Sequence, residues 1–373
     1  MDPSAYVPAY LERSYLDAHP ELTPAARELV HDDVWQRPEK YAVTEHAQAL
    51  VAYARTHAHL LAELDRMEDL PDEEFERRRG QLFDETRLAL AKIVEADRLV
   101  VDAHLVAAML SDMPLDDCIS DLMKIEARAR EYLEGSACGF DIDAPHFWTR
   151  GALESSGLTE AQLTQSDPMM IGWLHALEAI SQLCLATARY KAASSYARCA
   201  MRAAGYPSHA EGTVMLALAR LEDEDGFFEF VRELHSAEDA EGPGAEAKGA
   251  SHAFVPEDDE LAAVNRVPVD DSPWFLLART LLLFKSGRER PARRALRDFA
   301  ERCDGGAFFL LNPTYIDPYL PVRPAVREAW ELTHQAVWEA EGAVYDTPDF
   351  VPWAETVEGI FDASELFAER HGF

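Results

Sequence analysis

The sequence predicts an all-α protein built as a TPR-like (tetratricopeptide-like) α-α superhelix, a right-handed solenoid of helical hairpins. The strongest observation is the stretch 177–207, whose small and aromatic residues follow the spacing of the ~34-residue TPR repeat. Ser181 and Ala193 are expected to face each other where two antiparallel helices approach closely, and Pro207 ends the unit. A second stretch, 271–305, repeats this spacing. Because one hairpin cannot bury its own apolar face, we expect the hairpins to stack on one another.

The N-terminal part is predicted to be helical, because its apolar residues recur at helical spacing. Thr23 followed by Pro24 is typical of a helix start, with a capping side chain before a proline in the first turn. Asp102 is expected to begin a first TPR-like hairpin, which ends before Gly135. The expected helices are two short ones within 1–35, then 42–67, 72–96 and the hairpin 102–133.

The remainder alternates hairpins with irregular segments. Thr159 is expected to cap a short helix in the connecting segment, and Gly287 to form the turn of the last hairpin. The stretch after Gly306 is rich in proline and aromatic residues, which predicts a non-helical strap because proline removes backbone donors. The predicted organisation is an N-terminal helical region (1–140), a connecting segment (141–167), TPR-like repeats (168–305) with a disordered insertion at 238–256, and a strap with C-terminal capping helices (306–373).

The chain is strongly acidic: 35 Lys and Arg against 68 Asp and Glu give a net charge of −33 over 373 residues. Such a charge repels phosphate backbones and anionic lipid surfaces, so we expect neither nucleic-acid nor membrane binding. A basic partner would be attracted, although acidity can also serve solubility alone. The five cysteines form no C-x-x-C pair, which argues against a disulfide scaffold or a zinc site. No signal peptide and no apolar run near ~18 residues is recognised, so a cytoplasmic location is expected.

Several segments carry a resemblance to a known family. They are DAHLVAAML (102–110), HFWTRGALESS (146–156), the central hairpin, WFLLARTLLLFKSGRERPARRAL (274–296) and LLNPTYIDPYL (310–320). In this order they resemble the bacterial tetratricopeptide-like proteins related to the suppressor-of-tumorigenicity TPR-like family. Eukaryotic members carry membrane segments that are not recognised here, and 238–256 looks inserted. The resemblance implies the solenoid fold but no defined activity.

A TPR array binds partners on its concave surface, which is lined by first-helix residues one turn from the packing stripe. These positions are acidic, neutral or apolar here, which suits a helix or an extended segment with basic flanks. The Lys, Asn and Arg set that clamps a C-terminal carboxylate is absent. Alternatively, the strap or the terminal helices fill this groove from within. The predicted groove residues are His175, Glu178, Gln182 and Leu185 on the central hairpin, and Trp274, Leu277, Leu281 and Phe284 on the last one.

No catalytic, cofactor or metal motif is recognised in the sequence. His57 and His59 would point about 200° apart on a helix, which is the wrong geometry for one ion. We therefore expect a non-enzymatic scaffold that binds a peptide or a basic protein surface, with no cofactor and no metal. One alternative is an enzyme that uses His146 with a neighbouring carboxylate, at a site between the HFW segment and the strap. Another is a structural protein that assembles with copies of itself.

Overall fold

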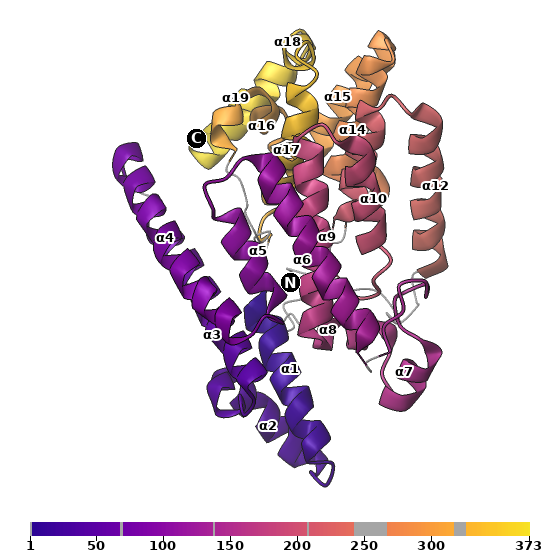
Figure 1. Ribbon diagram of the computed structural model, residues 1–373. Helices are drawn as coiled ribbons and strands as arrows, with labels where there is room; N and C mark the ends of the chain where they lie inside the picture. The colour runs from indigo at the N-terminus through magenta and orange to yellow at the C-terminus, as the bar shows by residue number, and fades with distance from the viewer. Residues whose placement is uncertain (1, 68–69, 137–138, 207–208, 242–266, 317–325) are drawn as a thin grey trace.

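The computed structural model describes residues 2–67, 70–136, 139–206, 209–241, 267–316 and 326–373 (Figure 1). The regular structure of these residues is helical, apart from one isolated β-bridge between Phe140 and Trp148. The all-α prediction is therefore confirmed. In Figure 1 the N-terminal helices lie at one end of the molecule and the C-terminal helices at the other.

The first half of the chain follows the predicted helices closely. The Thr23 hydroxyl accepts a hydrogen bond from the Ala26 backbone, so the expected cap is present. Thr159 forms a capping box with Gln162 at the start of the expected short helix. A helix at Arg150–Ser156 was not anticipated. The helices are α1 (Pro3–Ala18), α2 (Pro24–Gln36), α3 (Glu45–Met67), α4 (Asp72–Ala96), α5 (Val101–Met109), α6 (Leu115–Gly135), α7 (Arg150–Ser156) and α8 (Glu160–Ser166), with a 3₁₀ turn at Pro38–Lys40.

The second half contains the two hairpins on which the sequence prediction was centred. Gly287 has a φ of +68° at the turn of the last hairpin, a conformation that glycine adopts without strain. The helices are α9 (Pro168–Ala186), α10 (Tyr190–Ala200), α11 (Ala210–Arg220), α12 (Glu224–Glu241), α14 (Pro273–Lys285), α15 (Glu289–Arg302), α16 (Gly306–Leu311), α17 (Ala329–Tyr345), α18 (Phe350–Glu355) and α19 (Ile360–His371), with 3₁₀ turns at Val269–Asp271 and Pro313–Tyr315.

Two of the sequence predictions need correction. Residues 238–241, the start of the insertion expected to be disordered, are helical, since α12 continues to Glu241; alanine and glutamate are good helix formers. Residues 242–256 lie outside the described residues. The strap is also not irregular from its start, because Gly306–Leu311 forms α16 before the first proline, Pro313. The rest of the strap, 317–325, lies outside the described residues.

Successive helices pack against one another along the chain. Contacts join α3 to α4, α4 to α5, α5 to α6, α6 to α9, α9 to α10 and α10 to α11. The series continues through α11 and α14 to α15. Small residues allow the close approach inside the central hairpin: Ser181 and Ala193 are both fully buried, as the spacing predicted.

Helices from both ends of the chain pack against helices in the middle of this series. Helix α1 contacts α3 and α9, and α17 contacts α9, α11 and α14. Helix α9 therefore lies at the centre of the protein. It is the one described helix that is long and apolar enough to span a membrane, with a mean hydropathy of 1.3, but 78% of that stretch is buried inside the protein. A core helix of a globular protein has this composition as well.

Candidate functional site

The structure does not leave the predicted groove open to a partner. Four of its apolar residues are buried: Leu185, Trp274, Leu277 and Leu281 are each at most 1% exposed. Phe284 is half-buried against two aromatic rings of α18, Phe350 and Trp353. His175, Glu178 and Gln182 are also half-buried. The expectation that these residues form an accessible groove is therefore wrong for this structure.

Helix α17 covers the part of the predicted groove that belongs to the last hairpin. The Trp274 indole Nε1–H donates a hydrogen bond of 2.7 Å to the Glu339 carboxylate in the middle of α17. One face of the indole stacks on the His209 ring, with centroids 4.5 Å apart. Gly212 makes room for Trp274, because a Cβ there would lie 2.2 Å from the indole. This arrangement matches the alternative in which terminal helices of the same chain fill the groove.

Helix α1 takes part in a buried polar network at the central hairpin. The carboxylate of Asp102 on α5 accepts a hydrogen bond of 2.5 Å from the Tyr6 hydroxyl of α1. Its other oxygen lies 2.9 Å from Nδ1 of His175. Burial by itself would raise the pKa of Asp102, but the His175 ring and the two hydrogen bonds outweigh it and lower that pKa. This network ties α1, α5 and α9 together.

Glu178, another polar residue of the predicted groove, is bound by a different part of the chain. Glu178 accepts a hydrogen bond of 2.6 Å from the hydroxyl of Tyr206, in the segment that follows α10. The Tyr206 ring lies 5.9 Å from that of His175. Two of the three polar side chains predicted to bind a partner thus bind other parts of the chain.

The surroundings of His146 do not resemble an acid–base site. Its Nδ1–H donates to the backbone carbonyl of Arg202 at 2.9 Å, and its Nε2 lies 3.8 Å from the Glu160 carboxylate. The His146 side chain is 46% exposed and that of Glu160 36% exposed. No group of three or more His, Cys, Asp or Glu residues that could hold a metal ion occurs among the described residues.

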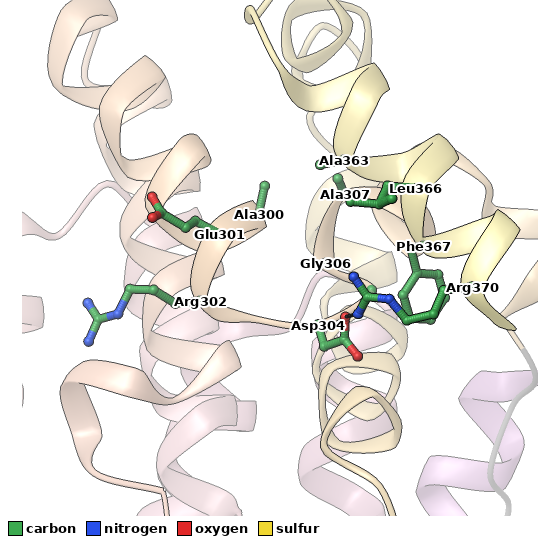
Figure 2. Close-up of a pocket in the computed structure, with 11 residues that line it drawn as sticks. Ala300, Glu301, Arg302, Asp304, Gly306, Ala307, Ala363, Leu366, Phe367 and Arg370 are labelled. Carbon is green, nitrogen blue, oxygen red and sulfur yellow. Dashed lines mark hydrogen bonds and ion pairs between the residues drawn. The ribbon is translucent and has the colours of Figure 1, made fainter.

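A surface cavity of about 310 Å³ lies between α15, α16 and α19 (Figure 2). Both apolar and charged side chains line it. Ala300 and Glu301 of α15 line one side, and Ala363, Leu366 and Phe367 of α19 line the other. The further lining residues are Arg302, Asp304, Gly305, Gly306, Ala307 and Arg370.

The charged residues around this cavity leave an excess of negative charge. Both lining arginines are paired, Arg302 with Asp271 and Arg370 with Asp304. Glu301, Asp362 and Glu369 are not in an ion pair with any described residue.

Leu366 stands between two of these carboxylates. Asp362 and Glu369 lie one turn before and one turn after it on the same side of α19. The Leu366 side chain lines the cavity and is nevertheless 57% exposed. Helix α19 therefore presents an accessible leucine side chain with a carboxylate on either side of it.

The sequence prediction missed this surface, since it treated α19 only as a capping helix. A signal was present in the spacing of Asp362, Leu366 and Glu369, but spacing alone does not reveal which face of a helix stays exposed. Comparisons with protein-family models, with curated proteins and with solved structures find no match for this chain, so the family resemblance stays a prediction.

Proposed function

We propose that the chain is a non-enzymatic interaction scaffold with a TPR-like superhelix, which binds a basic protein or peptide in the cytoplasm. The order of helix contacts supports the superhelix. The pairs would be α3/α4, α5/α6, α9/α10, α11/α12 and α14/α15. In the first three pairs the second helix packs on the first helix of the next pair, as in stacked helical repeats.

The partner would bind at the cavity between α15 and α19 rather than in the groove predicted from the sequence. A segment entering that groove would first have to displace α17 and break the Trp274–Glu339 hydrogen bond. It would then have to replace the contacts of a helix that is held at high effective concentration because it belongs to the same chain.

The observation that carries the proposal is the exposed Leu366 beside unpaired carboxylates, in a protein with a net charge of −33. An apolar side chain of the partner would enter the cavity, and flanking Lys or Arg residues would face Asp362, Glu369 and Glu301. The charge of the whole chain would speed the encounter with a basic partner. Residues at the rim of an interface influence the association rate more than the dissociation rate.

The test uses a panel of fluorescein-labelled basic peptides, each with one central Leu or Phe, titrated with the full chain in an anisotropy assay. We expect saturable binding that weakens with added salt. The double variant Asp362→Lys/Glu369→Lys should bind at least tenfold more weakly, and Leu366→Ala should also lose affinity.

A matched control reverses two negative charges elsewhere. Glu95 on α4 and Glu131 on α6 are exposed and are not in an ion pair with any described residue. The variant Glu95→Lys/Glu131→Lys should retain wild-type affinity. Equal losses in both double variants would show attraction to net charge alone, and would overturn the proposed site.

A further inference from the structure

A second cavity, of about 190 Å³, lies between the α4–α5 turn, α5, α6 and the start of α9. Its floor is apolar: Val101, Ile125 and Met169 line it, and each is at most 7% exposed. The ring of Tyr132, 46% exposed, stands at its edge. Pockets for drug-sized ligands are usually about 300–1,000 Å³, so this one suits a smaller molecule.

Two arginines line the same cavity without a carboxylate partner. Arg98 lies in the turn before α5, and Arg128 lies on α6. Neither is in an ion pair with a described carboxylate; Arg128 donates from Nε to the Lys124 carbonyl at 3.0 Å, which leaves its terminal nitrogens available. Both residues are exposed, so their guanidinium groups are accessible from solvent. Two unpaired guanidiniums at one cavity with an apolar floor favour a ligand with negative charge.

His104 of α5 also lines the cavity, next to the backbone of Arg98 in the preceding turn. Burial, and then the positive charges of Arg128 and Arg98, lower the His104 pKa. The ring is thus neutral at pH 7 and adds no charge to the cavity.

We propose that this cavity binds a small carboxylic acid with an apolar body. The carboxylate would lie between the guanidiniums of Arg98 and Arg128, and the body would cover the apolar floor. Guanidinium groups bind carboxylates with two parallel hydrogen bonds, which favours an acid over an uncharged analogue. The apolar floor favours an organic acid over inorganic phosphate, which would lose hydration there without compensation. This site is separate from the peptide-binding surface of the proposed function.

The test titrates the full chain with phenylacetate, with its uncharged analogue phenylacetamide and with inorganic phosphate, followed by ligand-observed NMR. Phenylacetate should bind saturably, and each of the other two at least about tenfold more weakly, since a hydrogen bond to a charged group contributes that much. Arg98→Gln and Arg128→Gln should each weaken phenylacetate binding about tenfold, and the double variant should abolish it.

The control is Arg232→Gln on α12. Arg232 is exposed, is also not paired with a described carboxylate, and lines neither cavity. The Arg232→Gln variant should bind phenylacetate as the wild type does. Circular dichroism checks that all variants are folded. Equal binding of the amide or of phosphate would overturn the proposal. So would the absence of saturable phenylacetate binding at millimolar concentration, or wild-type affinity in the double arginine variant.

Discussion

Gly342→Ala should weaken the contact between α17 and α9, the contact through which the C-terminal part of the chain reaches the central helix. A Cβ at residue 342 would lie 2.6 Å from the Ala186 Cα and 3.0 Å from its carbonyl oxygen. Real Cβ atoms do not approach other atoms so closely. Because the neighbouring atoms belong to the backbone, they cannot rotate away, and the two helices would have to move apart.

The size of the effect follows from two opposing contributions. Alanine is a better helix former than glycine by about 0.8–1 kcal/mol. Overpacking a tight contact costs about 1–3 kcal/mol. Gly80→Ala provides the matched control, because Gly80 also lies inside a helix, α4, and a Cβ there meets no atom within 4 Å. The helix-propensity gain cancels between the two variants, so the free energies of unfolding should differ by about 1–3 kcal/mol.

Urea unfolding followed by tryptophan fluorescence measures this difference. Trp330 and Trp338 lie on α17, so the signal reports on the affected region. We expect Gly80→Ala to raise the urea midpoint and Gly342→Ala to fall clearly below it, with similar denaturant slopes. An equal rise in both variants would refute the close packing of α17 on α9.

The other predictions concern buried titratable groups. Because the folded state lowers the pKa of Asp102 below its ordinary 3.8, the associated stability is present above that pH and lost as the pH falls through the lower, folded pKa. Asp102→Asn should remove this acid-dependent loss in urea unfolding between about pH 2 and 5; an unchanged profile would contradict it. Burial lowers the pKa of His57 below 6.5 and its Nε2 has no hydrogen-bond partner among the described residues, so stability should fall as the pH drops below 6.5. His57→Leu should abolish that fall and be more stable at about pH 5 by roughly 1 kcal/mol or more, whereas a fall of wild-type size would argue against a buried neutral ring. Burial raises the pKa of Cys303 to about 12, so iodoacetamide at about pH 8 should label it only after denaturation, as peptide mass spectrometry would show; rapid labelling of the native protein would be inconsistent with this burial.

Local sequence signals predicted most helices because their causes lie within a few residues. Thr23 and Thr159 cap the helices they were expected to cap, since a capping hydroxyl needs only the next turn of backbone. Helical spacing of apolar residues located both hairpins. The short helix α16 was not predicted, because the prolines that follow it led us to expect an irregular strap throughout.

The candidate sites could not be predicted in the same way. Asp102 and His175 lie 73 residues apart, and Trp274 and Glu339 lie 65 residues apart. No local pattern indicates that these side chains meet. Likewise, Arg98 and Arg128 face one cavity only because α5 and α6 pack together.

The sequence by itself determined that the chain is helical, where most helices lie, and which apolar residues form stripes that need to be covered. Only the tertiary structure decided what covers those residues. An apolar stripe on Trp274, Leu277 and Leu281 has the same spacing whether it faces a partner or a helix of the same chain. The hydrophobic effect has no direction and rewards either kind of burial. Here α17 is always present at high effective concentration because it is part of the chain, so it occupies the face that the sequence alone had left open to a partner.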